Sequence, residues 1–242
     1  SQVHLSNIDY QMALEEYATA DRYYDVSKKI TPRTKVILPV HFAGMACNMD
    51  EILLLAKEFD LKVVEDAAHA LPTTYKGKMI GALKSDVTVF SFYANKPMTT
   101  GEGGMVVTRN TALARRMKIM RLHGIDRNAF DRFQSKKPAW YYEVIAPGFK
   151  YNMTDIAAAI GIQQLKKLPG FLERRQYLAR RYFKALTDLP IVMPADDTDG
   201  GSHSWHLFVI RLQKSYFSIS ANILTIVFFE MECFSFSSRK TN

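Results

Sequence analysis

The chain has 242 residues, of which 48% are hydrophobic, 23% charged and 12% aromatic. This balance is typical of a globular protein and excludes the disordered, collagen-like and coiled-coil classes. The formal net charge is +8, and the excess of basic side chains lies after residue 110. The basic part of the chain after residue 110 could bind an anionic small substrate or nucleic acid. Its basic residues lie on helix-like segments without an aromatic platform, which favours a solvated basic face over nucleic-acid binding.

Cysteine and histidine usage narrows the kinds of site that we expect. The two cysteines, Cys47 and Cys233, cannot form a disulfide framework in a chain of this size, so we expect a reducing compartment, the cytoplasm. Of the six histidines only His203 and His206 form a close pair, and two ligands do not make a zinc site, so no metal is expected. No signal peptide is visible, and the longest apolar run, 223–229, is too short to span a membrane, so we expect no membrane partner.

The first half of the chain alternates between predicted strands and helices. Residues 1–34 indicate a short strand followed by turn and helix. Helical spacing after a capping-box pattern at 48–51 predicts a helix over 52–59, and a further helix is predicted over 110–122. Compact apolar runs predict strands at 35–41, 61–65, 87–91 and 105–108. Continuous apolar strands alternating with helices are typical of an α/β domain whose mostly parallel sheet is covered by helices on both faces.

From about residue 153 the pattern becomes helical and a second unit begins. Two helices, a loop and a strand are predicted in order over 155–165, 170–187, 196–202 and 205–212. The last strand should open a smaller α+β domain. We therefore expect a large domain over 1–190 and the truncated beginning of a small domain over 191–242. The segment after Lys214 has no clear caps and is left unassigned.

Polar residues at the ends of predicted strands are the candidates for a site, because ligands gather at the carboxyl ends of parallel strands. His41, Asp66 and Ser91 hold such positions. On spacing alone, Asp66 is better explained as a helix N-cap, and Ser91 could simply end its strand. Lys96 follows Ser91 in a glycine-containing loop without a dinucleotide, P-loop or hydrolase motif. It is either an exposed lysine or a nucleophile that forms a Schiff base.

Three segments read together resemble one family. VVEDAAHA, FSFYANKPMTTGEGG and APGFKYNMTDIAAAIGIQQLKKL are similar in order, spacing and composition to the DegT/DnrJ/EryC1/StrS aminotransferases. ITPRTKVILPVHFAG and SHSWHLFVIRL are weaker matches, so the resemblance covers about 30–212. It implies a pyridoxal-phosphate enzyme of nucleotide-sugar biosynthesis with the aspartate-aminotransferase type of fold. The domains expected above would then be an incomplete cofactor-binding large domain and the start of the small domain.

The resemblance gives the two central residues a role. Lys96 matches the lysine that forms a Schiff base with pyridoxal phosphate, which makes it the catalytic residue. Asp66 matches the carboxylate that pairs with the pyridine nitrogen of the cofactor. An ionised aspartate there keeps this nitrogen protonated, so that the ring can accept electrons. Family members with histidine at the lysine position run a dehydration, so Lys96 favours transamination.

Four further residues are carried over as cofactor-binding residues. Ala68 matches the small residue under the ring, and His69 matches the neighbour that reaches the cofactor's edge. Ser91 matches a phosphate-binding hydroxyl, and Asn152 resembles a residue that reaches the phosphate of the other subunit of a homodimer. Without the resemblance, His69 reads as a structural histidine. Asn152 reads as the flank of the following helix, which Thr154 could cap equally well.

The resemblance also implies the reaction. In a ping-pong cycle, an amino-acid donor, glutamate, would pass its amino group to a keto sugar carried on a nucleotide diphosphate. FSFYANK and APGFKYN are most similar to enzymes that make 4-amino-4-deoxy-L-arabinose on UDP for lipid A, hence for lipopolysaccharide. The family's pattern begins before this chain and continues beyond it, and its phosphate-gripping loop precedes the match. A partial chain with weak cofactor binding is therefore expected. The alternative is a non-catalytic remnant with a binding or regulatory role.

Overall fold

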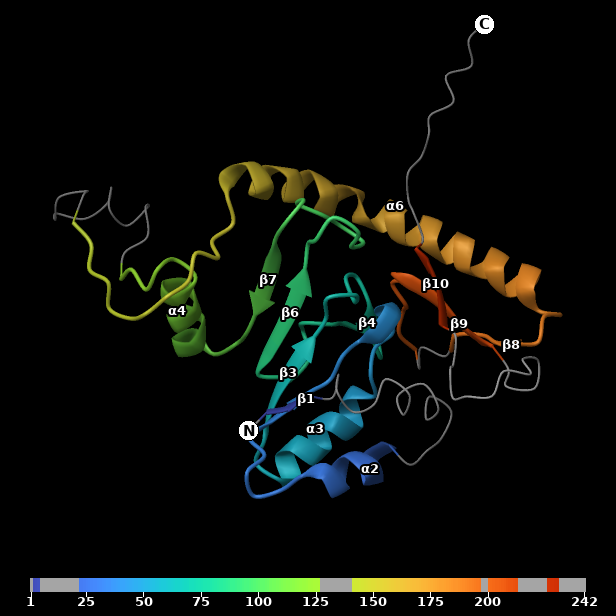
Figure 1. The fold of residues 1–242 in the computed structure, drawn as a ribbon, viewed down its shortest axis with the longest axis horizontal. Helices are drawn as coiled ribbons and strands as arrows, with labels where there is room; N and C mark the ends of the chain where they lie inside the picture. The colour runs from blue at the N-terminus through green and yellow to red at the C-terminus, as the bar shows by residue number, and fades with distance from the viewer. Residues whose placement is uncertain (1, 5–21, 127–140, 197–199, 213–225, 231–242) are drawn as a thin grey trace, which may run out of the picture.

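A computed structural model describes most of the chain, with the remaining residues drawn in grey in Figure 1. The described residues are 2–4, 22–126, 141–196, 200–212 and 226–230. Expectations for 5–21, for part of the 196–202 loop and for most of the segment after Lys214 lie outside them. Within this part of the chain, no helix is long and apolar enough to cross a membrane, and no three potential metal ligands gather.

The main sheet has five strands in the order β1-β2-β3-β6-β7. Neighbours from β1 to β6 are parallel, and β7 runs antiparallel to β6. The strands are β1 (Gln2–His4), β2 (Val36–Leu38), β3 (Lys62–Asp66), β6 (Val87–Ser91) and β7 (Gly104–Val107). The predicted mostly parallel α/β sheet is therefore confirmed, and each predicted strand is found within a few residues of its expected ends.

One face of this sheet carries the core. Ile37, Val63 and Phe90 point into a buried apolar cluster. Helix α3 (Met49–Glu58) packs on β2 and β3, and α2 (Arg22–Lys29) packs on α3. The opposite face is less covered, since all four residues of β7 are exposed and Val89 of β6 is 37% exposed. The sheet is thus deeply buried on one side only.

A buried polar network joins three strands within the sheet. The Glu65 carboxylate is fully buried and accepts hydrogen bonds from His41 Nε2 at 2.8 Å, from Thr88 Oγ1 at 2.8 Å and from Ser85 Oγ. Burial raises the pKa of Glu65, but the hydrogen bonds from His41 and Ser85 more than offset it and the net pKa is lowered. The carboxylate is therefore ionised, with each of its oxygens satisfied.

The predicted capping box at 48–51 is wrong. Asn48 is the N-cap of α3, but its side chain makes no capping hydrogen bond. Its Oδ1 instead accepts the hydroxyl of Tyr75 at 2.9 Å, because that buried tyrosine needs a polar partner. Tyr75 belongs to a hairpin of β4 (Thr74–Tyr75) and β5 (Lys78–Met79) that the sequence analysis missed. Its turn residues Lys76 and Gly77 both have positive φ, as a tight two-residue hairpin turn requires.

The two helices predicted over 155–165 and 170–187 are a single helix. Helix α6 (Asp155–Leu186) has 32 residues and contains Pro169 (Figure 1). Its N-cap is Thr154, whose hydroxyl accepts the amide of Ala157 at 3.3 Å. The helix continues past Pro169 because it is anchored on both sides, by Leu168 in the core of the main sheet and by Ala179 in a second core. The helix predicted over 110–122 is α4 (Thr111–Met120).

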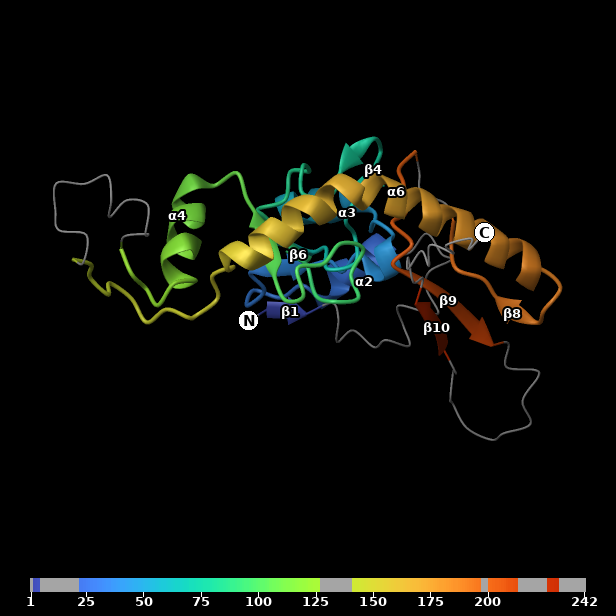
Figure 2. The ribbon, with the colours of Figure 1, turned by 90° about the horizontal axis from the view of Figure 1, so that it is seen from above.

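The second core lies beside a small antiparallel sheet. Its strands are β8 (Ile191–Val192), β9 (Leu207–Leu212) and β10 (Ile226–Glu230), in the order β10-β9-β8. Figures 1 and 2 both place this sheet along the C-terminal half of α6. The predicted strand 205–212 starts two residues late, because Trp205 has a φ of +48°. Trp205, just before β9, and Phe208, within it, both pack against Phe183 of the helix.

Candidate active site

The last residue of β3, Asp66, is fixed by the neighbouring strands. Its amide donates to the Pro39 carbonyl at 2.8 Å, and its own carbonyl accepts the His41 amide at 3.0 Å. Its carboxylate Oδ1 accepts the Ala68 amide at 3.0 Å, which forms a tight turn at the carboxyl end of the strand. Asp66 and Ala68 are both half-buried. The sheet therefore presents this carboxylate at the edge where ligands bind in parallel sheets.

Lys96 lies in the loop that joins β6 to β7. Its amide donates to the Tyr93 carbonyl at 3.1 Å, and the loop closes where the Thr100 amide meets the Phe92 carbonyl at 3.0 Å. The loop borders α6, since the Thr99 amide donates to Gln164 of that helix at 3.5 Å. Lys96 is half-buried, so its ammonium is partly desolvated.

His69 reveals that these groups lie together. The pKa of His69 is lowered to about 4, mainly by burial and then by the positive charge of Lys96, while the Asp66 carboxylate acts in the opposite direction. The two charges thus act on one imidazole, although they come from different strand ends. The Ala43 amide donates to His69 Nδ1 at 3.3 Å, so the neutral ring carries its hydrogen on Nε2. Lys96 and Asp66 therefore both lie near enough to His69 for their charges to act on it.

A fourth residue, His206, was missed as a site residue by the sequence analysis. It precedes β9 and is only 3% exposed, and its ring centroid lies 4.4 Å from that of His69. Its pKa is lowered to about 2, mainly by burial and in smaller part by His69, Lys96 and Arg175. Its Nδ1 has no hydrogen-bond partner among the described residues. The sequence placed this histidine inside a predicted strand, and no local pattern ties it to a residue 137 positions earlier.

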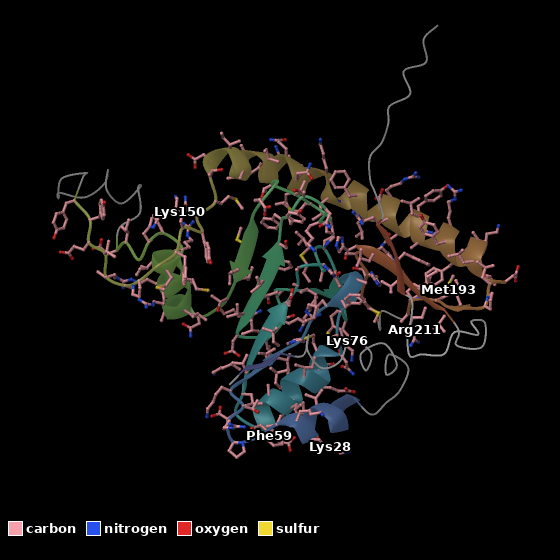
Figure 3. All side chains as sticks on the ribbon, viewed as in Figure 1. Lys28, Phe59, Lys76, Lys150, Met193 and Arg211 are labelled. Carbon is pink, nitrogen blue, oxygen red and sulfur yellow. The ribbon has the colours of Figure 1, made fainter. Side chains whose placement is uncertain are left out.

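The remaining predicted residues are placed less centrally. Ser91 ends β6, and its hydroxyl accepts the Tyr93 amide at 3.3 Å. His41 is fully buried, with its Nε2 2.8 Å from the Glu65 carboxylate. Asn152 has Lys150 and Met153 as its hydrogen-bond partners, neither of which belongs to the cluster. Figure 3 shows Lys150 on the α4 side of the molecule, far from Met193 and Arg211.

A comparison of the whole chain with known families is unambiguous. The model of the DegT/DnrJ/EryC1/StrS aminotransferase family matches residues 21–229, which include every residue of the cluster. The chain belongs to this family. The curated relative SpsC of Bacillus subtilis, a spore coat polysaccharide biosynthesis protein, is 46% identical over 185 residues. That alignment covers 76% of this chain and 47% of SpsC.

Solved structures agree with this assignment. Spr1654 of Streptococcus pneumoniae in its PMP-form superimposes with a TM-score of 0.71 at 32% identity, over 80% of this chain and 53% of that chain, and it is also solved in a PLP-form. PseC of Helicobacter pylori, an aminotransferase involved in the biosynthesis of pseudoaminic acid, gives a TM-score of 0.70 at 32% identity. It is matched over 80% of this chain and 50% of its own. The chain spans about half the length of the curated relatives it matches.

The cluster fits pyridoxal phosphate by its chemistry. A half-buried lysine amine can bind the carbonyl carbon of the cofactor, and a carboxylate can hold a proton on its ring nitrogen. Ala68 adds no bulk beside Asp66, which leaves room for a flat ring. The uncharged His69 offers an Nε2–H donor, and the buried, unpartnered Nδ1 of His206 is a polar atom of the kind that a bound group or water satisfies.

Proposed function

We propose that the protein is part of a pyridoxal-phosphate-dependent aminotransferase that acts on a sugar, with its reaction centre at Lys96. The observation that carries this proposal is the placement of Asp66 at the end of β3 and of Lys96 in the loop after β6, its parallel neighbour, with both charges acting on His69. A lysine and a carboxylate held at two adjacent strand ends are the pair that this cofactor requires. When bound, the cofactor supplies an electrophilic carbonyl carbon and an electron-accepting ring.

Each residue of the cluster then has a defined task. Asp66 holds a proton on the ring nitrogen, and its own position is fixed by the Ala68 amide. Lys96 Nζ binds the carbonyl carbon at rest and moves the proton of the substrate carbon during turnover. His69 faces the cofactor's edge with its Nε2–H, and Ser91 offers a hydroxyl to the phosphate. These residues come from two loops that the parallel sheet places side by side.

For the substrates, we propose an amino-acid donor, glutamate, and a keto sugar linked to a nucleotide diphosphate. SpsC takes part in polysaccharide biosynthesis and PseC in pseudoaminic acid biosynthesis, which supports a sugar acceptor. Exposed Arg174 and Arg181 on α6, both beside the ring of Tyr177, give that helix the sign that suits a diphosphate. A UDP-linked 4-amino-4-deoxy-L-arabinose precursor is the narrower expectation, with lipopolysaccharide as its destination.

We also propose that the working form is a homodimer in a reducing, cytoplasmic compartment. Large apolar side chains are exposed around the start of α6, with Ile156 at 78% and Tyr151 at 74% exposure, and Ile162 and Leu165 follow on the helix. Such a patch is typical of an interface. Asn152 lies inside this region, which supports its predicted reach toward the phosphate of the neighbouring subunit.

Borohydride reduction in the presence of pyridoxal phosphate tests the proposal. Reduction makes the lysine–cofactor bond permanent, and peptide mapping should then find the pyridoxyl group on Lys96. The Lys96→Ala variant should lose both the label and the yellow absorbance. Lys84 and Lys118 are the control lysines, because both are exposed, Lys84 just before β6 and Lys118 on α4. A label on either of them, or no specific label, contradicts the proposal and favours a non-catalytic remnant.

A further inference from the structure

His69 is held from four directions. Its Nδ1 accepts the Ala43 amide at 3.3 Å, and the Phe42 ring lies on one side at a centroid distance of 6.0 Å. The His206 ring lies much closer, at 4.4 Å and tilted by 51°. The Ser204 hydroxyl donates to the His69 carbonyl at 2.7 Å. Two of these four contacts come from one short segment just before β9.

That segment is itself fixed by helix α6. The buried Arg175 guanidinium donates through Nη1 to the Trp205 carbonyl at 3.0 Å and to the His206 carbonyl at 3.2 Å. Trp205 has a φ of +48°, which turns the chain so that His206 faces His69 while Trp205 enters the second core. The direction of the His206 ring is thus set by the helix and by the turn together.

On the other side of this segment, Gly44 allows the two backbones to approach closely. Gly44 has a φ of +103°, and a Cβ there would lie 2.0 Å from Ser204 Oγ and 3.2 Å from the His206 amide. Only glycine fits both the backbone conformation and the available space. The Ser204 amide also donates to the Gly44 carbonyl at 3.0 Å. The segment therefore sits against the main sheet in one arrangement.

We propose that His206 is a positioning residue of the active site, which holds the His69 imidazole in place beside Lys96 and links α6 and β9 to the reaction centre. This rests on the proposed function, in which His69 faces the cofactor. The ionisable groups that face the histidine pair are Lys96 and Asp66 on the side of the strand ends and Arg175 on the side of α6. In this environment both rings are uncharged, so they contact each other without repulsion.

The test is a pH titration of His69 in the full chain without cofactor, in which the NMR signals of its imidazole report the protonation state. In the parent chain His69 should titrate near 4. His206→Ala removes the covering ring and admits water, so the midpoint should move upward toward the ordinary value of 6.5. His206→Phe restores a buried ring and should return the midpoint to near 4. His203→Ala is the matched control, because His203 is 4% exposed and stacks on Trp205 rather than on His69.

An unchanged His69 midpoint in folded His206→Ala overturns the proposal, as does an equal shift in His203→Ala. If His206→Ala does not fold, His206→Gln takes its place, since glutamine keeps most of the volume but not the ring, and the same shift is expected. A second measurement follows the rate at which added pyridoxal phosphate gains its yellow absorbance. His206→Ala should slow it and His206→Phe should restore it. Absence of the absorbance in the parent chain contradicts the proposed function, while the titration still decides the role of His206.

Discussion

We expect this protein to lose stability on acidification already at pH values well above the usual pKa values of carboxylates. Burial is the main cause that lowers the pKa of His69, His203 and His206. The folded chain therefore binds fewer protons than the unfolded chain at any pH between these lowered values and 6.5. The contribution of these three neutral histidines to stability is fully present above pH 6.5 and is lost progressively as the pH falls below that value.

The size of the loss follows from His203 and His206, which are more buried than His69. The buried His41, whose pKa is raised to about 9, acts in the opposite direction but offsets only about 1 kcal/mol between pH 7 and pH 5. The pKa of His203 is lowered to about 3 and that of His206 to about 2, so both remain neutral in the folded chain at pH 5. In the unfolded chain each is almost fully protonated at that pH. Linkage then gives about 2 kcal/mol for each ring, or about 4 kcal/mol for the pair, relative to pH 7. His69 is half-buried and solvent-screened, so it is left out of this sum. Small domains have total stabilities of roughly 5–15 kcal/mol.

Urea unfolding at pH 7 and at pH 5, followed by tryptophan fluorescence, measures this loss. In the His206→Phe variant one of the two proton-binding differences disappears, so the loss between the two pH values should fall to about half. The matched control is His123→Phe, because His123 is exposed. Equal free energies of unfolding of the parent chain at pH 7 and pH 5 would refute the reasoning, since the buried rings would then have to be protonated in the folded state.

Three further predictions concern the strand ends and their support. Asp66→Asn should still allow cofactor to bind but should lower kcat by ~100-fold or more, because charge stabilisation in a dry site is worth about 3 kcal/mol; near-normal turnover would leave Asp66 as a turn-forming residue only. Glu65→Ala should lower the free energy of unfolding by about 3–5 kcal/mol, since it leaves His41, whose pKa is raised to about 9 despite its burial, without its partner; a loss below 1 kcal/mol in urea titration would argue against an ionised pair. Gly44→Ala should lower the thermal midpoint because its Cβ meets Ser204, whereas Gly77→Ala, in open space, should lower it less; equal effects of the two would show that strain, not contact, dominates.

The centre of the site was predictable because its residues are local to strand ends. Asp66 and Lys96 each follow an apolar run, and parallel neighbours place those ends together without further information. The family resemblance then predicts their roles, and the charges of both residues act on the pKa of His69. The role of Asn152 remains a prediction, because its contacts within this chain do not involve the cluster.

Features that depend on distant contacts could not be read from local patterns. His206 meets His69 only after the chain has passed through α6 and turned at Trp205. Two helices were predicted over 155–165 and 170–187, but packing on both sides of Pro169 makes them one helix. The antiparallel direction of β7 was equally hidden, since apolar runs do not encode strand direction.

The continuity of α6 has a mechanical consequence. A helix of 32 residues is about 48 Å long at 1.5 Å per residue, and α6 connects the core of the main sheet to the second core. A change of its direction would therefore move one core relative to the other. Pro169 has no amide hydrogen to donate to the carbonyl of Leu165, so we expect the helix to bend most easily at this turn. Pro169 follows Leu168, which is buried in the core of the main sheet. Arg175 lies about 1.7 turns further along the helix and donates hydrogen bonds to the turn before β9. Bending at Pro169 would therefore swing Arg175 and, through it, the ring of His206, so the stiffness of a single helical turn bears directly on the alignment of the reaction centre.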